Sequence, residues 1–418
     1  MKLLDPWLAD QDREVQESPE AIFREAKRRQ NRRRLAAGTS LVLAAGAVAV
    51  IAAAVASGAG TPPPHAAPSA NIRPVGTSGF RWVQIATVSA PSVRIGAPMA
   101  YDPATRQLVL IGGIREVTPM IGSPVATSTI LGDTWVFTRG NWTEMTSGRT
   151  PPTGAQPDVL AYDPARKELI LVTSPTFVKG TTRLTARSTT WTWTGSHWSE
   201  LLGDGPRWGT GAAGSVTYAG AALMAYDVAT QQLVFSPSNG RRNSTTSTYV
   251  LGKSRWLREH KPPLLRWMAY DPVTRRLLGE NGETGAMWWW TGKRWRLFTR
   301  HVVVHFKAGS IPGILVDGAN WVTDQSADEI MAFGNFYAST TTSHAPYQRG
   351  ELFTWLRGRW YPIDAPLHNT PSNIQFLSLA YDGSIGGVVA FGGGTGRMTG
   401  SRMWVSGGNG TWELVRSR

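Results

Sequence analysis

The sequence contains no cysteine. This absence excludes a disulfide framework, a thiol nucleophile, a cysteine-ligated zinc, an iron–sulfur cluster and a CxxC redox pair. Charged residues make up only 17% of the 418 residues, and acidic residues are the scarcer sign, which gives a net charge of 43 − 29 = +14. Tryptophan (19), glycine (45) and proline (27) are abundant. The 41% hydrophobic content is enough for a large core and argues against wholesale disorder.

Residues 35–56, LAAGTSLVLAAGAVAVIAAAVA, carry no charge. As a helix they would be roughly 33 Å long, which is enough to span a bilayer. The basic run from Lys27 to Arg34 precedes this segment, and no Lys or Arg follows it until Arg73. Because positive residues stay on the cytoplasmic side, we expect a single-pass membrane protein of bacterial type, with the N-terminus inside and the bulk of the chain extracytoplasmic.

Ala54-Val55-Ala56 has the A-x-A form of a signal-peptidase site, so a cleaved and secreted form is the alternative. The long charged segment ahead of the apolar run, and the length of the run itself, favour an uncleaved signal-anchor. The expected organisation is therefore a cytoplasmic charged segment (1–34) with a short helix from Pro19, a transmembrane helix (35–56), a spacer rich in Pro, Gly, Ser and Ala (57–79) and an extracytoplasmic domain (80–418).

The outer domain is repetitive. Ala-Tyr-Asp occurs five times, and each copy is followed by a turn-like stretch and an apolar run, as in DPATRQLVLIGG; a sixth, degenerate copy begins near Asp324. This pattern predicts a β-hairpin in which an Asp, followed by Pro in three of the copies, forms the turn. The repeated positions are Tyr101, Asp102, Tyr162, Asp163, Tyr226, Asp227, Tyr270, Asp271, Tyr381 and Asp382.

A second hairpin is predicted further along each repeat, where an aromatic residue is followed about seven positions later by tryptophan. The pairs are Trp135/Trp142, Trp191/Trp198, Tyr249/Trp256, Trp288/Trp295, Phe353/Trp360 and, one residue longer, Trp404/Trp412. Each repeat therefore contains four short antiparallel strands, which we call a, b, c and d. Units of this kind are typical of β-propeller blades, because radial stacking buries both faces of each sheet.

The motif AYDP…LVLIGG…DTWVF…NWTEM resembles the kelch repeat, and residues 80–417 resemble the propeller of the central domain of galactose oxidase. The resemblance implies an all-β, kelch-like propeller. We expect six blades, and a seventh built from the lone strand at Phe80–Val83 and the segment 301–318 is the alternative. The lone strand would pair with a terminal blade and close the ring. The copper chemistry of galactose oxidase needs a cysteine, so that activity is not implied, and no cofactor is expected.

Strand order in a propeller places the a–b and c–d turns on one face of the disc and the b–c and d–a segments on the other. The long, variable segments here are all of the b–c or d–a type. Loops on a rigid scaffold commonly carry binding residues. The candidate binding residues on this face are Arg115, Lys179, Arg183, Arg241, Arg242, His344, Tyr347, Arg349 and Arg397.

The sequence offers no catalytic motif and no metal site: the seven histidines are scattered, and His301 and His305 read as ordinary strand residues. An extracytoplasmic location and the lack of a long basic run after Arg34 argue against nucleic acid as a partner. We therefore expect a binding module for an extracytoplasmic protein or glycan. The alternatives are an uncharacterised propeller enzyme, of hydrolase or lyase type, that uses acids such as Glu116, Asp204 or Glu280 together with arginines, and a purely structural envelope protein.

Overall fold

The computed structural model describes residues 80–416 apart from short gaps. The gaps are 117–127, 147, 153–157, 175–187, 207–221, 238–246, 262, 264, 282–283, 301, 307–308, 326–327, 339–345, 357, 364–374, 400–401 and 408. The predicted cytoplasmic segment, transmembrane helix and spacer lie outside the described residues. Within the described residues the secondary structure is all β, and no helix there is long and apolar enough to cross a membrane.

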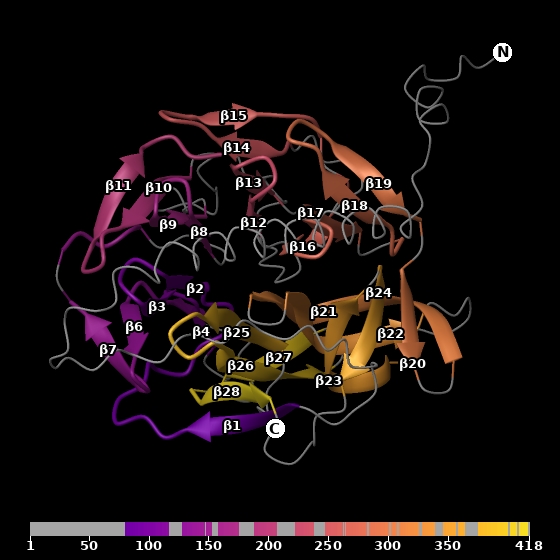
Figure 1. The fold of residues 1–418 in the computed structure, drawn as a ribbon. Helices are drawn as coiled ribbons and strands as arrows, with labels where there is room; N and C mark the ends of the chain where they lie inside the picture. Colours follow the sequence, from indigo (N-terminus) through magenta and orange to yellow (C-terminus); the bar gives the residue numbers. More distant parts are fainter. Residues whose placement is uncertain are drawn as a thin grey trace, which may run out of the picture.

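The described strands form six largely antiparallel sheets, arranged as blades around a centre, and one separate two-stranded sheet (Figure 1). Blades 1 to 4 each have the expected order a–b–c–d. The strands of blade 1 are β2 (Met99–Asp102), β3 (Gln107–Ile111), β6 (Thr134–Thr138) and β7 (Asn141–Met145), and those of blade 2 are β8 (Val159–Asp163), β9 (Glu168–Val172), β10 (Thr190–Trp193) and β11 (Trp198–Leu202). The strands of blade 3 are β12 (Leu223–Asp227), β13 (Gln232–Ser236), β14 (Tyr249–Leu251) and β15 (Trp256–Arg258), and those of blade 4 are β16 (Leu265–Asp271), β17 (Arg276–Asn281), β18 (Met287–Trp290) and β19 (Trp295–Thr299).

Blade 5 consists of β21 (Gly309–Asp324), β22 (Glu329–Ala338), β23 (Pro346–Leu356) and β24 (Arg359–Ile363). An additional strand, β20 (Val303–Phe306), pairs with both β21 and β24. The degenerate repeat near Asp324 is therefore a complete blade. The seven-blade alternative required the segment 301–318 as a separate unit, but the strands described within it, β20 and the first part of β21, belong to this sheet.

Blade 6 is completed by the beginning of the domain. Its strands are β25 (Gln375–Asp382), β26 (Gly387–Thr399), β28 (Thr411–Arg416) and β1 (Phe80–Ile85). Strand β1 pairs with β28 from Phe80↔Arg416 to Ile85↔Thr411, so the lone strand closes the ring as its sequence predicts. The innermost strands contact one another in sequence from β2 through β8, β12, β16, β21 and β25 back to β2. The propeller has six blades.

The last repeat differs from its sequence prediction. Trp404 and Trp412 do not form a c–d hairpin, because β26 is long enough to pair with two strands. Its first part pairs with β28, where Trp412 lies opposite Ala390, and its second part pairs with β27 (Arg402–Gly407), which carries Trp404. Trp412 thus occupies strand c, and Trp82 on β1 takes the strand d position.

The repeated aspartates account for the similar geometry of the a–b turns in the different blades. Asp102 is only 2% exposed; one of its carboxylate oxygens accepts a hydrogen bond from the Ala104 N–H at 3.0 Å, and the other accepts one from the Thr105 hydroxyl at 2.7 Å. Such bonds stabilise tight turns. Four residues after the Asp the backbone is left-handed in every blade, at Arg106, Lys167, Gln231, Arg275, Asp328 and Gly386.

The tyrosines that precede these aspartates bring neighbouring blades together. Burial, and next the charge of Asp382 in blade 6, raise the pKa of Tyr101 in blade 1. Burial and the charge of Asp102 likewise raise the pKa of Tyr162 in blade 2. A Cβ on Gly383 would lie 2.7 Å from the Tyr101 ring, so this turn requires glycine. The charges of Asp163 and Asp227 act in the same way on Tyr226 and Tyr270, so these four tyrosines each lie beside the turn of the preceding blade.

The strand d tryptophans link the blades by a repeated hydrogen bond. In four interfaces the indole N–H of a strand d tryptophan donates to a threonine at or just before strand c of the preceding blade. The pairs are Trp198–Thr134 (3.0 Å), Trp256–Thr190 (2.9 Å), Trp295–Thr248 (2.9 Å) and Trp142–Thr411 (2.8 Å). We call this contact the Trp–Thr clasp.

Blade 5 lacks the clasp on both sides. The positions equivalent to the threonines are Met287 in blade 4 and Leu352 in blade 5. Each lies three residues before the strand c residue that pairs with the strand d tryptophan. The indole nitrogens of Trp360 and Trp82, which face these positions around the ring, have no hydrogen-bond partner among the described residues. The two interfaces of blade 5 rely instead on ring packing, which includes Trp267 stacked on Trp321 with centroids 4.4 Å apart.

Replacing Thr134 with valine is expected to lower the free energy of unfolding by about 1–3 kcal/mol, because the shape is kept while the buried indole N–H of Trp198 loses its acceptor. Denaturant unfolding followed by tryptophan fluorescence measures the change. Thr143→Val is the control, since Thr143 is exposed on β7. Equal losses in the two variants would contradict a specific role for the clasp.

Candidate functional site

The b–c and d–a connections lie on one face of the disc, which we call the long-loop face. Five of the nine candidate binding residues lie outside the described residues: Lys179, Arg183, Arg241, Arg242 and His344. The other four lie on strands. Arg115 is an exposed residue of β4 (Ile114–Glu116), Tyr347 and Arg349 lie on β23, and Arg397 lies on β26.

Several segments expected to be loops are hairpins that extend the blades. In blade 1, β4 pairs with β5 (Ser128–Ile130); in blade 5, β22 and β23 continue beyond the blade; and in blade 6, the second part of β26 pairs with β27. Strand β27 contacts β4, so the extensions of blades 6 and 1 are neighbours. The fold therefore groups the backbone positions of Arg115, Tyr347, Arg349 and Arg397 on three consecutive blades.

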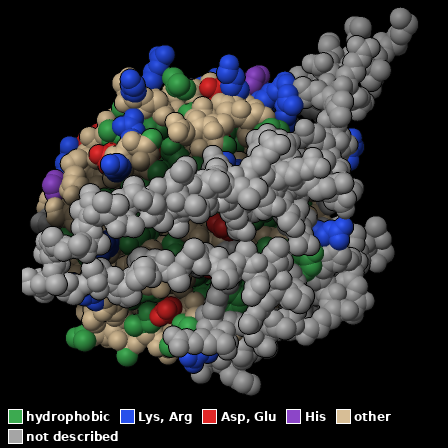
Figure 2. Space-filling model, viewed as in Figure 1, with side chains coloured by type: hydrophobic (Ala, Val, Ile, Leu, Met, Phe, Trp, Pro, Cys, Tyr) green, Lys and Arg blue, Asp and Glu red, His purple; other side chains and the backbone are tan. Residues whose placement is uncertain are grey.

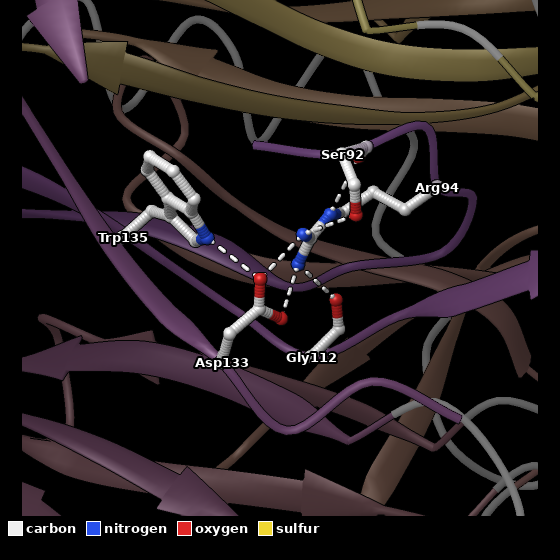
Figure 3. A network of polar contacts seen from close by, with 5 residues as sticks. All are labelled: Ser92, Arg94, Gly112, Asp133 and Trp135. Carbon is white, nitrogen blue, oxygen red and sulfur yellow. Dashed lines mark hydrogen bonds and ion pairs between the residues drawn. The ribbon is translucent and has the colours of Figure 1, made fainter. Parts of the chain in front are cut away.

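A buried arginine fixes the base of the β4–β5 hairpin (Figure 3). Arg94 is 1% exposed and lies between β1 and β2. Its guanidinium donates to both carboxylate oxygens of Asp133 at 2.7 and 2.6 Å, to the Gly112 carbonyl at 2.8 Å and to the Ser92 carbonyl and hydroxyl at 3.0 and 3.1 Å. The Trp135 indole also donates to Asp133, at 2.7 Å. This network joins the link before blade 1 to both ends of its b–c connection.

The charge of this network is internally balanced. Burial alone would raise the pKa of Asp133, but hydrogen bonds from Arg94 and Trp135 and the charge of Arg94 lower that pKa below its usual value. Ile95 pairs with Ile114 at the start of β4 through two 3.0 Å backbone hydrogen bonds. A Cβ on Gly113 would lie 2.9 Å from Ala97, so the backbones approach closely here. Arg94 is thus a positioning residue for the hairpin.

Two carboxyl groups near the long-loop face have raised pKa values. Asp158 precedes strand β8 and accepts a hydrogen bond from the Ser174 N–H at 2.7 Å. Burial raises the pKa of Asp158 to about 7, against the opposing effect of its hydrogen bonds with Ser174. Asp158 could not be recognised from the sequence, because the position is not part of the repeated motif and its burial depends on the folded blade.

Glu280, near the end of β17, is the second such group and is 1% exposed. One of its carboxylate oxygens accepts a hydrogen bond from the Trp267 indole at 2.5 Å, and the other has no partner among the described residues. Burial raises the pKa of Glu280 to about 8, although the Trp267 hydrogen bond and the charge of Arg266 act in the opposite direction. Glu280 is therefore protonated in the folded protein at neutral pH.

These two acids do not form a catalytic pair of the kind that acid–base chemistry uses. Asp158 belongs to blade 2 and Glu280 to blade 4, and neither charge contributes to the pKa shift of the other. Each carboxyl is instead held within its own blade. Among the described residues no group of three His, Asp or Glu side chains could hold a metal ion.

The basic side chains that the structure describes do not form one patch in the view of Figure 2. Lys and Arg are spread along the rim of the disc there, and Asp and Glu lie among them. The net charge of +14 therefore does not by itself locate a site on the described part of this face. The grouping of arginines on the hairpin extensions is a more specific feature.

No protein-family model matches the chain, and no curated protein sequence is significantly similar to it. Solved structures match the chain only at low similarity. A protein of unknown function from Bacteroides thetaiotaomicron is 10% identical with a TM-score of 0.42, covering 81% of this chain and 76% of that one. A gluconolactonase from Xanthomonas campestris is 12% identical (TM-score 0.39; 83% and 99% covered), and a putative glucose dehydrogenase from Thermus thermophilus is 13% identical (0.40; 81% and 100%). The six blades and the closed ring of innermost strands described above define the class of the chain as a six-bladed β-propeller.

Proposed function

We propose that this chain is a membrane-anchored, extracytoplasmic propeller of kelch type, similar to the central domain of galactose oxidase, which binds a protein or glycan through its long-loop face. The observation that carries the proposal is the set of hairpin extensions on blades 5, 6 and 1, where Arg349, Arg397 and Arg115 lie. Backbone pairing restrains the positions of residues on a hairpin, which lowers the entropy lost on association.

The short-turn face makes a poorer binding surface. Its a–b and c–d connections are tight turns of a few residues that the Asp hydrogen bonds and positive-φ residues shape. On the long-loop face, the length and sequence of the connections differ from blade to blade. Such a surface is not repeated around the ring, as expected if it recognises one partner. The uncharged run at 35–56 and the spacer at 57–79 support an arrangement in which the propeller stands outside the membrane.

The test measures how much full-length chain, in mild detergent, is retained on purified cell envelopes of the organism that makes it. The unmodified chain is compared with two triple variants. The triple variant Arg115→Gln/Arg349→Gln/Arg397→Gln is expected to lose about tenfold or more in retention, because a charge-assisted hydrogen bond contributes about 1.5–3 kcal/mol. The matched control removes three exposed arginines from the short-turn face: Arg106→Gln/Arg139→Gln/Arg255→Gln.

The control variant should bind as the unmodified chain does. Equal losses in both variants would mean that retention follows net charge rather than a particular face. Full retention of the long-loop variant would overturn the assignment of binding to that face.

A further inference from the structure

The a–b and c–d turns of neighbouring blades contact one another on the short-turn face. The guanidinium of Arg166, in the a–b turn of blade 2, donates to the carbonyl of Gly252, in the c–d turn of blade 3, at 2.7 Å. A Cβ on Gly195, in the c–d turn of blade 2, would lie 2.7 Å from Thr105 in the a–b turn of blade 1. The turns of adjacent blades therefore join into one surface, with the a–b turns at its centre, because strand a is innermost in each blade.

The exposed charged side chains of these turns are almost all positive. Asp328 is the one exposed acid among the turn residues that the structure describes. The repeated aspartates are buried and accept hydrogen bonds from the turns themselves, so a surface that approaches this face meets the cations first. The exposed cations of the c–d turns are Arg139, Lys253, Arg255, Lys293 and Arg294, and those of the a–b turns are Arg106, Lys167 and Arg275.

Two exposed apolar side chains lie in the a–b turns, inside this set of cations. Val228 in blade 3 and Ile385 in blade 6 are each 47% exposed. Blades 3 and 6 are opposite each other in the closed ring of six, so these side chains lie on either side of the central axis. Binding at a membrane interface combines buried apolar area with electrostatic attraction to anionic lipids. The short-turn face offers both.

The propeller also begins on this face. Strand β26 starts directly after the a–b turn of blade 6, and its Val388 pairs with Leu414 near the end of β28. Phe80 in turn pairs with Arg416, so β1 begins at the short-turn face and runs away from it. The spacer of 23 residues (57–79) leads to Phe80, and a coiled chain of that length spans about 25–30 Å on average. An anchor at 35–56 would therefore hold the short-turn face close to the bilayer.

We propose that the short-turn face docks on the anionic lipid surface of the membrane that carries the anchor. The exposed Lys and Arg side chains bind phosphate headgroups, Val228 and Ile385 insert among them, and the long-loop face points away from the membrane. A lipid surface requires no shaped pocket, so tight turns suffice. The tether gives the face an effective concentration of the order of millimolar, so weak contacts are enough. The inference rests on the proposed function, because it requires the anchor.

Energy transfer to labelled lipids tests the inference. Because the chain has no cysteine, a single introduced cysteine takes up one dye. The full-length chain is reconstituted into phosphatidylcholine nanodiscs that contain increasing fractions of phosphatidylglycerol and an acceptor on the headgroups. Transfer from Ala104→Cys, at an exposed a–b turn position, should rise with the phosphatidylglycerol fraction and fall at high salt. Transfer from Thr129→Cys, exposed on β5 of the long-loop face, should not rise.

Substitutions in the labelled chain identify the groups that dock. At the phosphatidylglycerol fraction that gives half-maximal transfer, Arg139→Gln/Lys253→Gln should lower the ratio of docked to undocked chains about 25-fold, since each cation near an anionic surface contributes a factor of about five. Val228→Ser/Ile385→Ser should lower it by about fivefold or more. The matched control, Lys261→Gln/Arg300→Gln, removes two exposed cations from the d–a links of the opposite face and should change nothing. Equal losses in the two charge variants would overturn the docking face.

The remaining outcomes separate lipid from other polyanions and docking from anchoring. Soluble poly(glycerol phosphate) offers no apolar layer and should not displace the face, and displacement at equal phosphate concentration would replace the lipid with a general polyanion. Transfer that ignores phosphatidylglycerol, in chains that do enter the nanodiscs, would overturn the docking and leave the proposed function standing. Failure to enter the nanodiscs would reject the anchor and the docking together. In the envelope test an uncharged detergent surrounds the anchor in place of lipid, so that test reports on the long-loop face alone.

Discussion

Replacing Glu280 with glutamine is expected to make the protein more stable at neutral and mildly alkaline pH. The folded-state pKa of Glu280 is about 8, against 4.5 for the free side chain. Between these values the folded protein keeps the proton and the unfolded chain releases it. The stability contributed by protonated Glu280 is therefore complete below about pH 4.5 and is lost as the pH rises through about 8.

The expected size is large, since each pH unit in this window changes the free energy of unfolding by about 1 kcal/mol. Glutamine does not ionise, and its carbonyl oxygen can still accept the Trp267 indole N–H. Denaturant unfolding of both proteins from pH 4.5 to 8.5 should therefore give curves that diverge as the pH rises. Glu144→Gln, an exposed substitution on β7, is the control. Parallel curves for the original chain and Glu280→Gln would show that burial of this carboxyl has no energetic consequence.

Replacing Trp82 with alanine is expected to remove about 3–5 kcal/mol of stability, because Trp82 is 3% exposed and its ring lies 5.4 Å from that of Phe333 in blade 5. The loss should also weaken the pairing of β1 with β28 that closes the ring. Hydrogen exchange measured by mass spectrometry is the sharper measurement, since residues 80–85 and 411–416 should lose protection together.

Trp198→Ala provides the comparison, since Trp198 is also 3% exposed and lies on strand d of blade 2. It should cost a similar free energy but reduce protection mainly in β10 and β11. If Trp82→Ala left β28 as protected as in the original chain, the closing role of β1 would be disproved.

Features that depend on residues close together in the chain, and that recur in each repeat, could be predicted from the sequence. Asp102 and its equivalents shape their turns through residues two and three positions away, so the pattern is visible in any single copy. The strand at Phe80 was recognisable as unpaired because it precedes the first complete repeat. Six blades followed from counting these units, including the degenerate copy at Asp324.

Features that depend on pairing between distant segments could not be predicted in the same way. The spacing of Trp404 and Trp412 imitates the c–d pairs of other repeats, yet β26 extends far enough to accept both β27 and β28. A local signal did exist. Threonine directly precedes the first aromatic residue in four blades, and Thr411-Trp412 has this form whereas Met403-Trp404 does not.

The candidate site was predictable only in outline. Topology placed Arg115, Arg349 and Arg397 on one face, but the hairpins that carry them replaced expected loops. Arg94 and Asp158 gave no sequence signal, because the burial of the first and the raised pKa of the second arise from neighbours far away in the chain.

The pairing of β1 with β28 also predicts an order of folding. The ribosome makes β1 before any other strand of the propeller, whereas its partner is made last. Blades 1 to 4 consist of consecutive strands and can form as the chain grows, but β1 must wait for nearly the whole domain. Contacts between segments so far apart in sequence form slowly, because a long loop must close first. We therefore expect the sixth blade to be the last to be completed, and a chain that loses β28 to leave its ring open.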